Sequence, residues 1–140
     1  MTAERAVPIT QHLGMLEGAG LIQLAATDPE LEYLFRHVLI QDAAYEALLR
    51  QERRELHAGV AASLEALYPE RLLELAPVLA HHWESAGETS RAVTHLVVAA
   101  RHARERFARH EARDFYARAA ALLAGPEPDP PTRALRAEVN

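Results

Sequence analysis

The 140-residue sequence contains no cysteine, and all 15 of its basic residues are arginine, so lysine is absent as well. Without cysteine there are no disulfides, no thiolate nucleophiles and no cysteine-ligated zinc. Without lysine there is no phosphate-loop NTPase site, Schiff-base enzyme or kinase, because each depends on a lysine. The 6 glycines are scattered and form no loop that cradles a phosphate. These absences exclude most nucleotide-dependent and covalent catalysis within these residues.

Long hydrophobic runs are also lacking. No window approaches the ~20 apolar residues of a membrane span, and the N-terminal residues lack the apolar core of a signal peptide. With 49% hydrophobic and 25% charged residues, the composition is typical of a soluble globular protein. We therefore expect a cytoplasmic protein that does not insert into a membrane. The net charge of −5 argues against non-specific binding to nucleic acid.

The composition favours helices, because 28 residues are alanine, 20 are leucine and β-branched residues are sparse. One stretch differs. After a helix predicted over 9–18, the segments 21–24 and 31–36 resemble short strands, and Thr27-Asp28-Pro29 between them is typical of a turn. We therefore predict a mainly α-helical fold that contains one β-hairpin.

From His37 onward, hydrophobic residues recur at helical spacing. A stripe made of Leu56, Val60, Leu64 and Leu67 predicts a helix that ends at Tyr68-Pro69. A further helix is expected to run through Pro77 and to end with Gly87 as its C-cap. Two more helices are predicted after Gly87. The hydrophobic stripe of the first extends from Ala92 to Phe107, and that of the second covers 112–122.

The spacing from Trp83 to Gly87 and on to Ala92 is that of a tetratricopeptide repeat, and the second half of this pattern recurs at Ala112. The interval from Ala92 to Ala112 is 20 residues instead of the usual ~34. We therefore predict an irregular, antiparallel array of tetratricopeptide type, with Trp83 in its core. Repeats of this kind need neighbours to bury both faces, so we expect the chain to be part of a longer protein.

Three runs of residues resemble a known family. They lie at 33–49, 53–57 and 79–87 and read YLFRHVLIQDAAYEALL, RRELH and LAHHWESAG. They are similar to the region that follows the ATPase core in bacterial STAND-type, AAA-like signalling ATPases. These include multidomain adenylate/guanylate cyclase proteins and related transcriptional regulators.

The resemblance implies a domain organisation. Residues 1–50 would be the C-terminal part of a winged-helix subdomain, and 51–124 would be the tetratricopeptide-like helical array. Residues 125–140 would be a proline-rich linker and the start of a further helix. The ATPase core, which binds ATP or ADP in such proteins, would lie in another part of the parent, so no cofactor is expected in these residues.

The resemblance also assigns site residues. His37 falls where related proteins carry a histidine that contacts the phosphates of bound ADP, although Arg36 and Val38 flank it here in place of the commoner Met-His-Asp. The alternative is a histidine at a helix N-terminus that forms local hydrogen bonds. The positions that carry the structural motif are Phe35, His37, Tyr45, His57, Trp83 and Gly87.

Eight histidines raise the question of a metal site. His81 and His82 are adjacent, so they point about 100° apart on a helix. His95 and His102 lie two turns apart, and no pair has the i,i+4 spacing of helical zinc sites. We therefore predict no metal site. The arginines between 101 and 118 are interpreted as a solvated helix face with ion pairs, in preference to a phosphate-binding surface.

The sequence predicts a non-catalytic regulatory and protein-interaction module of a larger STAND-like ATPase, which couples nucleotide state to partner binding. Its partner would be another protein or the parent's own domains. The alternative is a stand-alone winged-helix transcription regulator that binds DNA. Residues 9–19 offer only Gln11 and His12 as base readers, and Glu17 would repel phosphate, so nucleic-acid binding is not expected. No catalytic residue is predicted.

Overall fold

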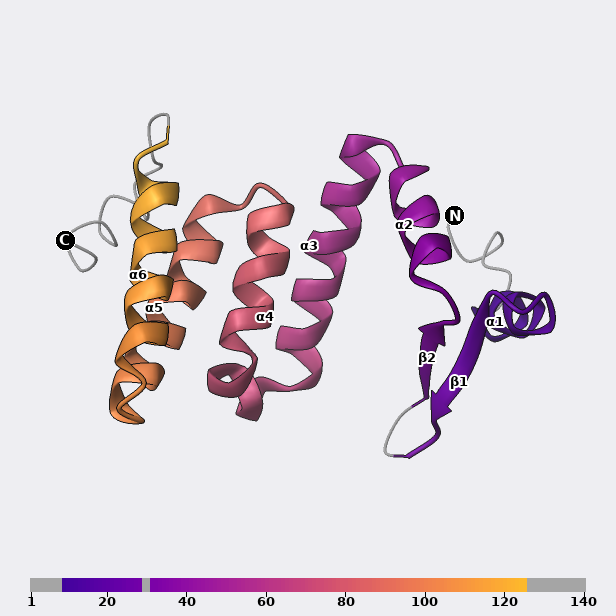
Figure 1. The fold of residues 1–140 in the computed structure, drawn as a ribbon, viewed down its shortest axis with the longest axis horizontal. Coiled ribbons are helices and arrows are strands. Elements are labelled where there is room, and N and C mark those ends of the chain that lie inside the picture. Colours follow the sequence, from indigo (N-terminus) through magenta and orange to yellow (C-terminus); the bar gives the residue numbers. More distant parts are fainter. Residues whose placement is uncertain (1–8, 29–30, 126–140) are drawn as a thin grey trace. The chain divides into compact units, whose positions relative to one another are not determined.

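The computed structural model describes residues 9–28 and 31–125 (Figure 1). The linker and helix start predicted after Gly125 lie outside these residues. The described residues form six α-helices and one two-stranded antiparallel sheet, which confirms the mainly helical fold with a short hairpin. Contacts divide the chain into two units, one up to Leu49 and one from Arg50 onward. None of the described helices is both long enough and apolar enough to span a lipid bilayer.

The first unit contains α1 (Ile9–Gly18), β1 (Ile22–Ala26), β2 (Glu32–Phe35) and α2 (Val38–Glu46). The two strands are antiparallel, with a register irregularity after the third residue of β1. Many apolar side chains of this unit are exposed, including Ile9, Met15, Leu31, Leu34, Val38 and Leu39. The predicted helix over 9–18 and the hairpin after it are both present.

The second unit contains α3 (Arg50–Leu67), a 3-10 turn η1 (Pro69–Arg71), α4 (Leu72–Ser85), α5 (Thr89–Glu105) and α6 (Arg109–Leu123). Each helix packs against the next along the chain, as Figure 1 shows. The connections are short, so successive helices run antiparallel. The predicted end of α3 at Tyr68-Pro69 is confirmed.

Small side chains dominate the core of the second unit. Alanines on all four helices are buried, and they let the helix backbones approach closely around a few large residues. Trp83 is only 4% exposed, which confirms that it belongs to the core. The buried residues form two clusters, one of Ala61, Leu79, Trp83, Ala86 and Ala92 and one of Ala80, Val93, Leu96, Val97, Ala119 and Leu123.

The hydrophobic stripe predicted along α3 faces mainly outward. Leu56, Val60 and Leu67 are exposed, and only Leu64 of the four packs against a core cluster. The buried contact with α4 is made by Ala61 instead. Because Ala61 is small, α3 and α4 can approach closely when this residue faces α4. In this orientation of α3, the larger side chains lie on its exposed face.

The turn between α4 and α5 depends on Gly87. Its φ is 81°, its N–H donates to the carbonyl of Glu84 at 3.0 Å, and the N–H of Glu88 donates to the carbonyl of Trp83 at 2.9 Å. This is a Schellman cap, with glycine in the left-handed conformation just after the helix end. Arg54 of α3 covers the turn, since its Nε donates to the carbonyl of Ala86 at 3.0 Å.

The turn between α5 and α6 corrects the prediction that Phe107 lies on a helical stripe. The helix ends at Glu105, and Phe107 follows it with a φ of 61° and 85% exposure. The N–H of Ala108 donates to the carbonyl of Ala103 at 2.8 Å and closes a second Schellman cap, of the same type as the one at Gly87. The chain must reverse here for α6 to pack on α5, and Phe107 takes the position that glycine holds at the preceding turn.

Phe107→Gly should stabilise the second unit. A left-handed conformation costs an L-residue about 1–2 kcal/mol, and the greater freedom of glycine in the unfolded chain offsets part of the gain. We expect the free energy of unfolding to rise by about 0.5–1 kcal/mol. Urea unfolding followed by circular dichroism measures the change.

Gly87→Ala is the matched control, because it places a Cβ at the equivalent residue of the preceding turn. That Cβ would lie 2.9 Å from Cζ of Arg54, and the φ of 81° disfavours it. The free energy of unfolding should fall by about 1–2 kcal/mol. Changes of equal sign in the two variants would contradict this account of the turns.

Candidate functional site

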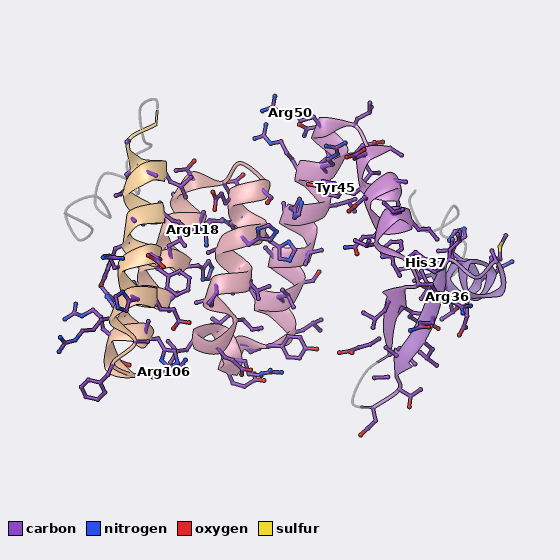
Figure 2. All side chains as sticks on the ribbon, in the orientation of Figure 1. Arg36, His37, Tyr45, Arg50, Arg106 and Arg118 are labelled. Carbon is purple, nitrogen blue, oxygen red and sulfur yellow. The ribbon has the colours of Figure 1, made fainter. Side chains whose placement is uncertain are left out.

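The predicted nucleotide-sensing residue, His37, lies in the first unit. It is the N-cap of α2, and its carbonyl accepts hydrogen bonds from the N–H groups of Ile40 and Gln41. Its side chain makes no capping hydrogen bond and is exposed. Figure 2 labels it beside Arg36, at the start of the helix. The local bonds of this residue therefore come from its backbone, and the imidazole is accessible from solvent.

The other predicted motif residues are divided between the two units. Phe35 and Tyr45 belong to the first unit, and each is 44% exposed. His57, Trp83 and Gly87 belong to the second unit, where Trp83 is buried and Gly87 forms the turn described above. Trp83 and Gly87 therefore have structural positions within the second unit.

Three histidines meet where α3 packs on α4. His57 projects from α3, and His81 and His82 project from α4. The Nδ1 atoms of His57 and His82 are 2.9 Å apart, so one of them carries a proton and donates a hydrogen bond to the other. The ring of His81 lies 5.8 Å from that of His57 and 5.3 Å from that of His82, measured between centroids.

The surroundings favour the uncharged form of two of these rings. Burial lowers the pKa of His57 below its usual 6.5, and the nearby His81 lowers it further. Burial also lowers the pKa of His82, with additional contributions from His57 and His81. Neutral imidazole has one ring nitrogen with an available lone pair. At neutral pH, His57 and His82 therefore present lone pairs instead of positive charge.

The sequence argument missed this cluster because it compared only histidines on the same helix. His57 lies 25 residues before His82, and the antiparallel packing of α3 on α4 brings them together. The same packing places Arg54, one helical turn before His57, against Ala86, one turn after His82. A sequence signal did exist, because two helices joined by a short turn pair their residues in antiparallel order.

A second polar cluster centres on Glu65 of α3, which the sequence argument did not single out. Its Oε1 accepts hydrogen bonds from Nε1 of Trp83 at 2.8 Å and from Nε2 of His95 at 2.9 Å. The guanidinium of Arg91 lies 4.4 Å from the centre of the Trp83 ring, in a cation–π contact. One carboxylate therefore links α3, α4 and α5, and it satisfies the indole N–H of the buried tryptophan.

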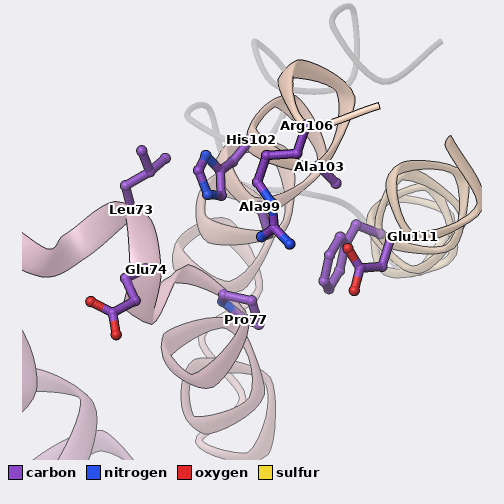
Figure 3. A pocket seen from close by; sticks show the side chains of 9 residues that line it. Leu73, Glu74, Pro77, Ala99, His102, Ala103, Arg106 and Glu111 are labelled. Carbon is purple, nitrogen blue, oxygen red and sulfur yellow. The ribbon is translucent and has the colours of Figure 1, made fainter. Parts of the chain in front are cut away.

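A pocket of about 140 Å³ lies between α4, α5 and α6 (Figure 3). Pro77 lies on its wall and has no amide to donate to the carbonyl of Leu73. The Nδ1 atom of His102 is buried without a hydrogen-bond partner in the described structure. Five lining residues are apolar (Leu73, Pro77, Ala99, Ala103, Phe115) and four are polar (Glu74, His102, Arg106, Glu111).

The charges around this pocket are not equivalent. Arg71 donates two hydrogen bonds to the carboxylate of Glu74, at 2.9 and 3.0 Å, and these bonds lower the pKa of Glu74. Within the described ranges, Arg106 has no ion-pair partner, and Figure 3 shows its guanidinium reaching into the middle of the pocket. Glu111 also lines the pocket and has no ion-pair partner among the described residues, so the pocket carries one such charge of each sign beside an apolar wall.

The arginine-rich part of α5 and α6 contains ion pairs. Arg118 donates to Glu84 of α4 at 2.7 Å. Arg101 and Arg104 line a hollow of about 420 Å³ together with Glu105, so an acidic group lies among the basic ones. The described lining of this hollow therefore carries charges of both signs.

Comparison with protein-family models, with curated proteins and with solved structures gives no match.

Glu65→Ala should destabilise the second unit. The indole N–H of Trp83 and the Nε2 of His95 would both lose their acceptor, and a buried donor without a partner costs about 1–3 kcal/mol. Urea unfolding followed by the fluorescence of Trp83, the only tryptophan, reports the change directly.

Glu55→Ala is the control on the same helix. Glu55 is exposed, and its side chain accepts a hydrogen bond from Gln51 on the same exposed face. Removing it should change the free energy of unfolding by less than about 0.5 kcal/mol. Equal losses in the two variants would show that Glu65 has no special role.

Proposed function

We propose that the chain is a non-catalytic regulatory and protein-interaction module of a larger STAND-like signalling ATPase. In this proposal the first unit is the C-terminal part of a winged-helix subdomain that couples nucleotide state to the second unit. The second unit is a tetratricopeptide-like array that binds a protein partner or one of the parent's own domains.

Repetition in the second unit supports this proposal. The turns at Gly87 and Phe107 have the same hydrogen bonds and lie 20 residues apart. Five residues after each turn, Ala92 and Ala112 are buried at equivalent positions. Successive helix–turn–helix units of one design are the basis of helical repeat arrays, whose surfaces commonly bind proteins.

The pocket between α4, α5 and α6 is the observation that carries the proposal. Pockets for small molecules and cofactors usually measure about 300–1,000 Å³. A pocket of about 140 Å³ is therefore too small for a nucleotide, but it suits one side chain of a partner. The apolar wall and the guanidinium of Arg106 favour a partner segment that presents a carboxylate next to an apolar residue.

The reading frame that encodes this chain provides the first test. The proposal expects a product several times longer, with an upstream phosphate-binding loop that contains a lysine. In that longer protein, His37→Ala should raise basal ATP turnover, because ADP would be held less tightly, whereas His12→Ala should not. A product without an ATPase domain would overturn the proposal, and a salt titration with duplex DNA would then test the alternative of a DNA-binding regulator.

Arg106→Glu tests the pocket. When the chain is titrated with the remainder of the parent protein in a calorimeter, the reversed charge should weaken binding by about tenfold or more, equivalent to about 1.4 kcal/mol. Arg113→Glu is the matched control, because Arg113 lies on α6 and does not line the pocket. Equal affinities of the wild type and Arg106→Glu would exclude this pocket as the binding surface.

A further inference from the structure

We propose that His57, His81 and His82 form a binding site for one divalent transition-metal ion of the Zn²⁺ class. The site is distinct from the pocket between α4, α5 and α6, and it does not depend on the function proposed above. It also differs from the expectation drawn from the sequence, which considered spacing along single helices only.

The geometry needs only small adjustments to hold such an ion. One ring nitrogen from each histidine lies within 4.8 Å of the corresponding atoms of the other two. Zinc–nitrogen bonds of about 2.0–2.1 Å place ligand atoms about 3.4 Å apart in a tetrahedral site. The 2.9 Å between Nδ1 of His57 and Nδ1 of His82 is slightly shorter than this spacing. His81 is exposed, so its ring can rotate inward without disturbing the core.

The donor set selects the class of metal. Three imidazoles without a carboxylate suit Zn²⁺, Cu²⁺ or Ni²⁺, whereas Mg²⁺ and Ca²⁺ require oxygen ligands. A metal ion binds the neutral form of a histidine, through a ring nitrogen that carries no proton. In the hydrogen bond that joins the rings of His57 and His82 one Nδ1 carries a proton, and for both Nδ1 atoms to bind an ion this proton would move to Nε2 of the same ring.

The position of the site gives the ion a structural consequence. His57 belongs to α3, and the other two ligands belong to α4, so one ion would join two helices of the array. Three protein ligands leave the fourth position of a tetrahedral zinc site open. Because His81 is exposed, water or a ligand atom from a partner would occupy that position from the solvent side.

The competing account is that the three rings only pack together. The rings of His57 and His81 are nearly perpendicular, at 89°, which is an edge-to-face contact that needs no ion. The two accounts differ in what they predict for added metal. Packing alone predicts no saturable binding that depends on these three side chains.

Calorimetric titration of the full, untagged chain with ZnCl₂, after removal of metal with EDTA, tests the proposal. The wild type should bind one ion per chain. His81→Gln should weaken binding by about tenfold or more, and His57→Gln and His82→Gln should do the same. His110→Gln is the matched control, because His110 lies on α6 outside the cluster, and it should bind as the wild type does.

His81→Gln is the most informative variant, because an exposed side chain can be replaced without loss of the fold. A second measurement needs no variant at all. In nuclear magnetic resonance spectra of the wild type, Zn²⁺ should shift the ring signals of three histidines and leave the other five in place, and Mg²⁺ should shift none. The proposal is overturned if His81→Gln binds Zn²⁺ as tightly as the wild type, or if Zn²⁺ leaves these three ring signals unchanged.

Discussion

The indole of Trp83 holds α3, α4 and α5 in one arrangement. Its ring fills the space between alanines of the neighbouring helices, and its N–H donates to Glu65 of α3. The same carboxylate accepts from His95 of α5. A buried indole N–H without an acceptor would be costly, so a shift of α3 away from α4 would be unfavourable. The contacts of Arg54 with Ala86 and of His57 with His82 lie along the α3–α4 interface that this arrangement defines.

The turns between helices are the second constraint on the array. Gly87 and Phe107 both adopt left-handed conformations, and both close the same pair of hydrogen bonds after a helix. Glycine does this without strain, and phenylalanine does not. The packing of α6 on α5 must therefore compensate for the conformation of Phe107. Phe115 of α6 contributes to this packing, and it also lines the pocket that contains the guanidinium of Arg106.

Two features of the second unit carry the proposals on function. The pocket is small and has an apolar wall beside a guanidinium, which suits a side chain of a protein partner. The histidine cluster gathers three nitrogen ligands from two helices, which suits a metal ion. The two sites involve different residues. A metal ion that joins α3 to α4 would stabilise the array, while the pocket between α4, α5 and α6 would meet the partner.

The sequence alone determined the helical composition, the hairpin, the helix end at Tyr68-Pro69 and the turn at Gly87. These signals act within a few residues, because propensity, proline and glycine restrict the backbone locally. Only the tertiary structure decided that α3 turns Ala61 inward and Leu56, Val60 and Leu67 outward, and that α5 stops before Phe107. It also brought His57 to His82 and Glu65 to Trp83. These pairings join residues 18 to 25 positions apart, and they depend on how closely whole helices pack, which no local pattern specifies.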